Sequence, residues 1–285
     1  MKLRYIIYIL PLLLFSSFSS CSSNSEIESS ADLITEKTLF NENYGNNNQQ
    51  VFDIYLPANR NKNSTKTLVL IHGGSWIAGD KADMNYLVPL LKQSFPDYAI
   101  VNINYRLASL ENPAFPMQLD DISAILTKLN NSDYGISGNI GFIGASAGAH
   151  LSMLYGYGFN ADNKIKLVCS IVGPTNFTDE NYLNNPNLSG LFTVVTGFPY
   201  QGKETYYQQL SPLFRATASS PPTVMFYGNA DLLIPTSQGI ALNNQLTELN
   251  VYHDFYLYNG GHGNWSATDQ LDTYNKLVAF ISLKF

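Results

Sequence analysis

The segment 144–148 has the sequence Gly-Ala-Ser-Ala-Gly, which places a serine between two glycines. It follows a short apolar run and precedes a stretch of helical length that begins at Ala147. A Gly-x-Ser-x-Gly segment between a strand and a helix is typical of a sharp turn that exposes the serine hydroxyl. Side chains at the two glycine positions would clash with neighbouring backbone. The sequence therefore predicts Ser146 as a nucleophile at the amino end of a helix, where negative charge on oxygen is stabilised.

A serine hydroxyl needs a base to act as a nucleophile at neutral pH. The four candidates are His72, His150, His253 and His262. We expect His262 to be the base, because it lies in a glycine-rich loop directly after the predicted strand 255–258. His253 precedes that strand, and His150 lies one turn into the predicted helix, where packing is the better explanation. We expect His72 to anchor its own loop by hydrogen bonds.

The base in turn needs a carboxylate that holds its tautomer and stabilises its cation. Asp231 follows the predicted strand 223–227 and lies between the serine and His262 in the chain, which is the order expected on a hydrolase sheet. The alternative role for Asp231 is a turn residue or helix cap, since Pro235 and Thr236 mark a helix start nearby. Asp254 is a weaker candidate, because it adjoins the early end of a strand.

A loop that follows the predicted strand 67–71 has the sequence His-Gly-Gly-Ser-Trp. Glycines let a backbone approach a ligand closely. The backbone N–H groups of Gly74, Ser75 and Ala147 are the expected oxyanion hole, and each such donor contributes about 3 kcal/mol to transition-state binding.

Aromatic residues flank these segments. Trp76 adjoins the expected oxyanion loop and Trp265 follows His262. Both are candidate substrate contacts, and packing explains each of them equally well. Four tyrosines of the segment 174–222 are candidates for lining an acyl or carbohydrate pocket, or for the packing of that segment: Tyr182, Tyr200, Tyr206 and Tyr207.

Strand-like and helix-like segments alternate after residue 50, which predicts an α/β fold with a mostly parallel central sheet and helices on both faces. The segment 174–222 breaks the alternation and is expected to be a small cap insertion. The run 51–56 alternates apolar and polar residues and is expected to be an edge strand. Further strands are predicted at 67–71, 99–105, 140–143, 167–172, 223–227 and 255–258, and helices at 84–93, 116–129, 147–157, 237–249 and 271–283.

The amino terminus has the layout of an export signal. Lys2 and Arg4 precede an apolar run, and residues 18–21 (Phe-Ser-Ser-Cys) resemble a bacterial lipoprotein box. We expect a signal peptide over 1–20, lipidation of Cys21, and a flexible tether over 21–49 before a domain at 50–285. The alternative is plain secretion with cleavage near the serines. We expect the protein to lie on the periplasmic or cell-surface side of a membrane and to be attached to that membrane only through the lipid anchor.

Composition excludes other classes. The 285 residues carry 16 Lys and Arg against 22 Asp and Glu, and this acidic balance disfavours nucleic-acid binding. Cys169 lies in an apolar run and is expected in the core. No cofactor or metal is expected: Asp120 and Asp121 are explained by helix amino-end charge, because no His or Cys cluster accompanies them. The composition does not decide the oligomeric state.

Together these motifs resemble the α/β-hydrolase superfamily over about residues 50–285, and more narrowly the hormone-sensitive-lipase-like carboxylesterases. In shape the chain is most similar to bacterial feruloyl and acetylxylan esterase-like proteins. The segments 101–108 (Val-Asn-Ile-Asn-Tyr-Arg-Leu-Ala) and 115–116 (Phe-Pro) also match this pattern. The resemblance implies a serine carboxylesterase that removes acetyl or feruloyl groups from plant polysaccharide fragments through an acyl-enzyme. Those families often have Gly where this chain has Ser75.

Two other hypotheses stay open. An amidase or arylformamidase uses the same triad, a His-Gly-Gly-x-Trp loop and a Gly-x-Ser-x-Gly-Ala-His stretch. A hydrolase fold that has lost its chemistry would act as a binding lipoprotein, although such proteins usually lack a triad member.

Overall fold

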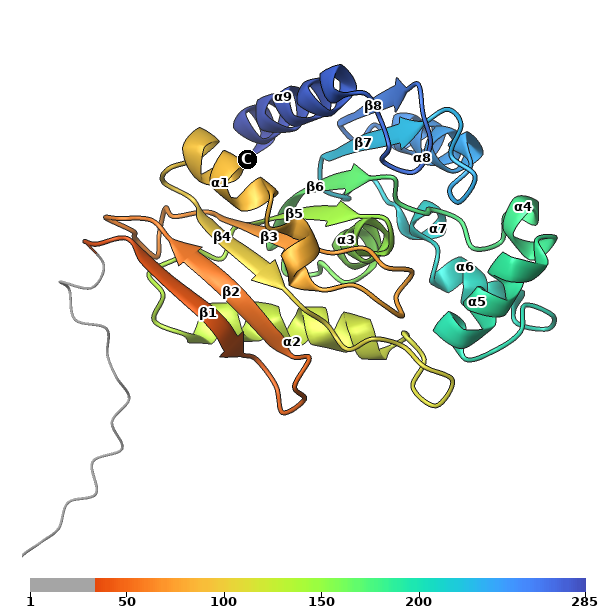
Figure 1. Cartoon of the computed structure of the whole chain (residues 1–285), viewed down its shortest axis with the longest axis horizontal. Helices are drawn as coiled ribbons and strands as arrows, with labels where there is room; N and C mark the ends of the chain where they lie inside the picture. The colour runs from red at the N-terminus through yellow and green to blue at the C-terminus, as the bar shows by residue number, and fades with distance from the viewer. Residues whose placement is uncertain (1–33) are drawn as a thin grey trace, which may run out of the picture.

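A computed structural model describes residues 34–285. Its centre is an eight-stranded sheet in the order β1-β2-β4-β3-β5-β6-β7-β8 (Figure 1). β3 to β8 run parallel to one another, and β2 pairs antiparallel with β4. The strands are β1 (Lys37–Asn43), β2 (Val51–Leu56), β3 (Thr67–Ile71), β4 (Ala99–Ile103), β5 (Ile140–Ala145), β6 (Ile165–Ile171), β7 (Thr223–Gly228) and β8 (His253–Tyr258).

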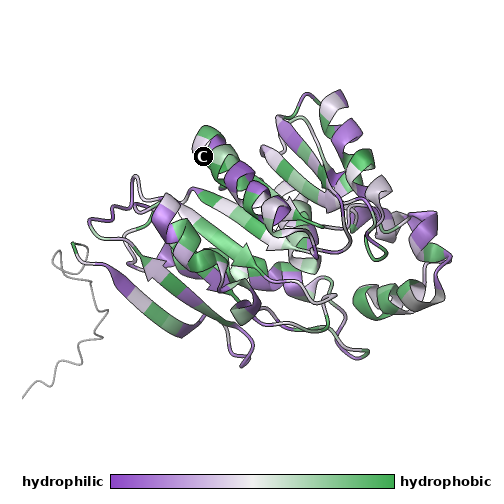
Figure 2. Ribbon diagram, turned by 45° about the horizontal axis from the view of Figure 1, so that its top comes forward, coloured by the Kyte–Doolittle hydropathy of each residue, from purple (hydrophilic) through white to green (hydrophobic). Residues whose placement is uncertain are grey.

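Helices cover both faces of the sheet, as expected for a mostly parallel sheet whose strands are apolar on both sides. α1 and α9 bury their apolar sides in one core and α2, α3 and α8 in the other, and Figure 2 shows hydrophobic residues concentrated in the central strands. Cys169 is fully buried in β6, as predicted. The predicted fold class is confirmed. These helices are α1 (Leu87–Ser94), α2 (Met117–Asn131), α3 (Ala147–Gly158), α8 (Thr236–Glu248) and α9 (Ala267–Lys284), and a short 3₁₀ helix, η1 (Lys81–Met84), precedes α1.

The start of the domain differs from the prediction. β1 pairs antiparallel with β2, so at least residues 37–43 of the expected tether 21–49 belong to the sheet. β2 therefore lies between β1 and β4 and is not an edge strand. The predicted signal peptide, Cys21 and the first part of the tether lie outside the described residues. Within residues 34–285, no helix is both long and apolar enough to cross a bilayer.

The segment between β6 and β7 contains the helices of the expected cap. Figure 1 places α4 and α5 beyond the carboxyl ends of β5 and β6, away from the body of the sheet. The cap comprises residues 174–222. Its helices are α4 (Glu180–Leu183), α5 (Pro186–Thr196), α6 (Glu204–Gln209) and α7 (Pro212–Arg215).

Asp121 has a role that the sequence analysis did not predict. Its carboxylate is fully buried and accepts hydrogen bonds from the guanidinium and the backbone N–H of Arg106, at 2.6 and 2.8 Å. Gln50 donates a third, at 2.7 Å. Asp121 therefore fixes the segment after β4 onto α2. Only Asp120 matches the predicted helix amino-end charge.

We expect Asp121→Ala to lower the free energy of unfolding by about 2 kcal/mol, because the Gln50 amide and the N–H of Arg106 lose their buried acceptor, while the Arg106 guanidinium is partly exposed to solvent. Urea denaturation measures this value. Asp120→Ala is the matched control: Asp120 is exposed, and its loss should cost less than about 1 kcal/mol. Equal effects of the two substitutions would contradict the assigned role of Asp121.

Candidate active site

Ser146 lies at the turn between β5 and α3, with φ 52° and ψ −117°. Non-glycine residues rarely adopt positive φ, and such strain persists only where the surroundings hold it. A Cβ at Gly144 would overlap the carbonyl of Gly148, and a Cβ at Gly148 would overlap the carbonyls of Ile71 and His72. The predicted turn is therefore present, and its two glycines are required by backbone contact.

His262 connects Ser146 to Asp231. The imidazole Nε2 lies 3.0 Å from the Ser146 hydroxyl, and Nδ1 lies 2.7 Å from Asp231 Oδ2. The imidazole is about a quarter exposed, whereas the Asp231 carboxylate is fully buried. The structure thus brings together three side chains from the carboxyl ends of β5, β7 and β8, which the sequence analysis had grouped.

The Asp231 carboxylate is held as an anion. Burial raises its pKa, but the hydrogen bond with His262 and those from the N–H groups of Ile234 and Leu233 outweigh burial, and the pKa lies below its ordinary value. The two backbone donors lie 2.9 and 2.8 Å from Oδ1. Asp231 therefore has both of the roles considered for it. Its Oδ2 pairs with His262, and its Oδ1 accepts the backbone hydrogen bonds of a turn.

Trp265 holds the loop that carries His262. Its indole N–H donates to the carbonyl of Gly261 at 2.9 Å, and its ring packs on Tyr258, with 4.9 Å between centroids. Trp265 is only 6% exposed. Its contacts are therefore those of packing, the alternative to a substrate contact.

The predicted oxyanion loop lies against Ser146. A Cβ at Gly73 would stand 3.2 Å from the Cβ of Ser146. The next three residues all have positive φ: 109° at Gly74, 54° at Ser75 and 65° at Trp76. Among the described residues, none accepts a hydrogen bond from the N–H groups of Gly74, Ser75 or Ala147. These donors are free for a ligand.

Hydrogen bonds from two other segments hold this strained loop. Tyr105, just after β4, donates its hydroxyl to the His72 carbonyl at 2.9 Å. The Gln118 amide of α2 and the N–H of Ala108 both donate to the Trp76 carbonyl, at 2.8 and 2.9 Å. Gln118 was not predicted to hold this loop. A polar residue at a helical position that faces the core was its only signal, and Gln118 is indeed fully buried.

The remaining histidines lie apart from the Ser146 hydroxyl. His72 stacks on Tyr105 at 4.3 Å, and its Nδ1 lies 2.6 Å from the Gly73 carbonyl, so it contacts its own loop as predicted. His253 is the first residue of β8, and its ring contacts the carbonyl of Val251, which precedes the strand. His150 is fully buried within α3.

An aromatic cluster joins α3, the oxyanion loop and the cap. His150 stacks on Phe177 with 4.5 Å between ring centroids and lies perpendicular to Trp76 at 5.2 Å. Its Nε2 donates to the Leu210 carbonyl of the cap at 2.8 Å. Trp76, 3% exposed, also packs against Phe192. Packing therefore accounts for Trp76, and it accounts for His150 as predicted.

The sheet order and the Ser146–His262–Asp231 arrangement together define an α/β-hydrolase. Within that class the chain belongs to the BD-FAE family, whose model matches residues 52–246.

Similar proteins agree with this placement. Esterase LipC of Mycobacterium tuberculosis is 24% identical, matching 77% of this chain and 58% of its own length, and isoprenylcysteine alpha-carbonyl methylesterase ICME of Arabidopsis thaliana is 26% identical, with shares of 76% and 54%. The chain thus spans about half the length of the curated relatives it matches. A solved structure titled a truncated carbohydrate esterase from gut microbiota has a TM-score of 0.69 at 22% identity, covering 87% of this chain and 99% of that one. The structural likeness shows the fold.

We expect His150→Gln to weaken the pH dependence of stability. Burial lowers the pKa of His150 to about 3, and the Leu210 hydrogen bond only partly opposes this. Below the ordinary value of 6.5 the unfolded chain binds a proton that the folded chain refuses until about pH 3. His150 therefore makes the free energy of unfolding fall as the pH is lowered through this window.

Gln keeps a donor for Leu210 and does not titrate. Between pH 7 and pH 4.5, the free energy of unfolding measured in urea should fall by about 2.5 kcal/mol less in the variant than in the wild type. The His150 ring signals in NMR should stay constant from pH 8 to 5. A His150 that titrates in this range would contradict the buried neutral imidazole.

Proposed function

We propose that this chain hydrolyses carboxylic esters with Ser146 as nucleophile, His262 as base and Asp231 as its partner. The hydrogen-bonded series from Asp231 Oδ2 through His262 to the Ser146 hydroxyl, at 2.7 and 3.0 Å, carries the proposal. Membership of the BD-FAE family and the named esterases among its relatives support it.

In the proposed reaction the Ser146 Oγ attacks the ester carbonyl carbon while its proton moves to His262 Nε2. The carbonyl oxygen becomes an oxyanion that accepts hydrogen bonds from the free N–H groups of Gly74, Ser75 and Ala147. The C–O bond to the alcohol breaks, and His262 returns the proton to the leaving oxygen. Water then attacks the acyl-enzyme by the same steps, which releases the acid and restores Ser146. The buried anion of Asp231 stabilises the imidazolium in both halves.

The proposed substrates are acetyl or feruloyl esters on plant polysaccharide fragments. Two similar solved structures are titled a carbohydrate esterase and a bifunctional GH43-CE protein, and these titles support the same chemistry here. We also propose export and lipidation at Cys21, which would place the domain on the periplasmic or outer side of a membrane.

Ser146→Ala should lower kcat for p-nitrophenyl acetate by at least about a thousandfold, because the acyl-enzyme cannot form. A fluorophosphonate probe should label the wild type at this residue and leave the variant unlabelled. Ser152→Ala, a buried serine of the same helix, is the control and should still be labelled. Undiminished hydrolysis by Ser146→Ala would refute the mechanism. Faster turnover of N-formylkynurenine than of every ester would favour the arylformamidase alternative.

Cys21→Ala should move the protein from the membrane pellet to the soluble fraction when the full chain is expressed in a bacterium that matures lipoproteins. Several acyl chains anchor a protein firmly, whereas an exported chain without them has no comparable hold. Immunoblots of the two fractions give the result. Cys169→Ala is the control and should stay in the pellet. Retention of the Cys21→Ala variant in the pellet would contradict the proposal that a lipid on Cys21 anchors the protein.

A further inference from the structure

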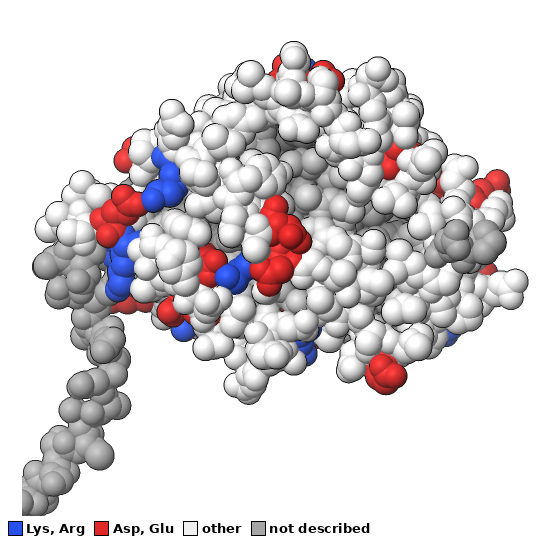
Figure 3. All heavy atoms as spheres, in the orientation of Figure 1, with Lys and Arg blue, Asp and Glu red and all other residues white. Residues whose placement is uncertain are grey.

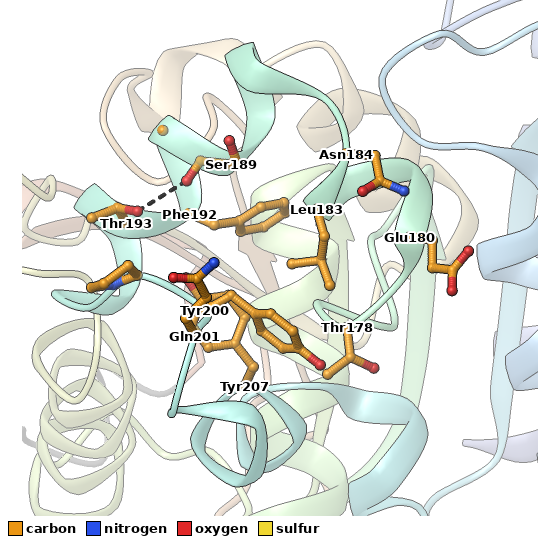
Figure 4. Close-up of a pocket in the computed structure, with 12 residues that line it drawn as sticks. Thr178, Glu180, Leu183, Asn184, Ser189, Phe192, Thr193, Tyr200, Gln201 and Tyr207 are labelled. Carbon is orange, nitrogen blue, oxygen red and sulfur yellow. Dashed lines mark hydrogen bonds between the residues drawn. The ribbon is translucent and has the colours of Figure 1, made fainter.

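A hollow lies in the cap, apart from the residues of the triad. It has a volume of about 860 Å³ and lies between α4, α5 and the segment that runs from Pro199 into α6 (Figure 4). Its described lining does not include Ser146, His262 or Asp231. The volume is within the range of cavities that enclose small organic ligands. The triad residues therefore lie outside this lining.

One part of the lining is aromatic and another is polar. The aromatic part contains Phe192, Tyr200 and Tyr207, of which only Tyr200 is half-exposed, because Phe192 and Tyr207 are 3% and 1% exposed. Tyr207 packs edge to face on Tyr200, with 5.2 Å between ring centroids. The polar part includes Glu180 of α4, Asn184 directly after that helix and, from the facing segment, Gln201 (Figure 4).

These three polar side chains are available to a ligand. In the described part of the chain, the side chains of Glu180, Asn184 and Gln201 make no hydrogen bond to another residue. Glu180 is the one charged residue of the described lining, and no Lys or Arg contributes to it. The surface over α4 and α5 in Figure 3 is likewise mostly uncharged. A phosphate or a uronic acid would meet a carboxylate without a cation, so the chemistry favours a neutral ligand rich in hydroxyl groups.

One residue of the cavity lining packs against the residue that follows the expected oxyanion donors of the loop. The Phe192 ring lies 6.1 Å from that of Trp76, which follows Ser75 in the oxyanion loop. On the other side, Thr178 of the lining precedes Asp179, whose carboxylate accepts a hydrogen bond from Gln238 of α8 at 2.7 Å. The cap cavity is therefore next to the oxyanion loop, with the Phe192–Trp76 contact between them. The hydrogen bond from Gln238 connects the segment that lines it to α8, the helix that follows Asp231.

We propose that the cap cavity binds a neutral sugar unit of an esterified oligosaccharide whose ester lies at Ser146. The half-exposed ring of Tyr200 can pack on the apolar C–H face of a sugar, while the carboxylate and amide groups of the lining bond the sugar hydroxyls. An aryl acyl group presents a flat apolar face and few polar atoms, which would leave Glu180, Asn184 and Gln201 mostly unused. The inference rests on the proposed ester hydrolysis and names which part of the substrate the cap recognises.

The test uses the double variant Asn184→Ala with Gln201→Ala. Both side chains are exposed, so their removal should leave the fold intact. In the Ser146→Ala background, calorimetric titration with xylotriose should show a Kd about tenfold weaker in the double variant, as expected for two lost hydrogen bonds. In the active chain, kcat/KM for acetylated xylotriose should fall by a similar factor, while that for p-nitrophenyl acetate stays within about twofold.

Gln209→Ala is the matched control, because Gln209 is an exposed amide of α6 outside the lining. It should bind xylotriose like its parent. Absence of xylotriose binding to the Ser146→Ala chain, or equal binding by the double variant, would overturn the sugar site. So would a loss confined to methyl ferulate turnover, which would assign the cavity to the acyl group. Failure of the proposed function is separate: it would appear as undiminished hydrolysis in Ser146→Ala, whatever the sugar titration shows.

Discussion

The candidate site depends on one close backbone contact. Gly148, in the first turn of α3, lies so near the carbonyls at the end of β3 that no side chain fits between them. This contact holds the turn on which Ser146 adopts a positive φ, and it places the oxyanion loop beside the same turn. Nucleophile and oxyanion donors are thus positioned by the packing of one helix against one strand.

Parallel strands make the rest of the arrangement possible. β5, β7 and β8 end at the same edge of the sheet, so the loops that follow them deliver Ser146, Asp231 and His262 to one place although these residues are far apart in the chain. Each loop has its own support. Backbone N–H groups fix Asp231, and Trp265 fixes the His262 loop. These contacts hold the three reacting side chains in position before a substrate binds.

Sequence patterns predicted the strands that are apolar on both faces, such as β3 and β7, because these runs are too short for a helix and end at glycine-containing turns. They also predicted the grouping of Ser146, Asp231 and His262, since chain order and strand ends specify it. β1 was missed because its sequence, Lys-Thr-Leu-Phe-Asn-Glu-Asn, has only a weak alternation and its pairing with β2 is long-range. Three further features could not be predicted from the sequence, because each depends on partners from distant segments. They are the burial of Asp121, the burial of Gln118 and the stacking of Phe177 on His150.

The position of β1 has a mechanical consequence. As the outermost strand and the first described element, it receives any force that acts on the chain ahead of residue 37. Such a load falls on the β1–β2 ladder at one end of the sheet, while the strands that carry the three reacting side chains lie in the other half. A pull on the amino terminus would therefore strain hydrogen bonds at the sheet margin well before it changed the spacing of the serine, imidazole and carboxylate.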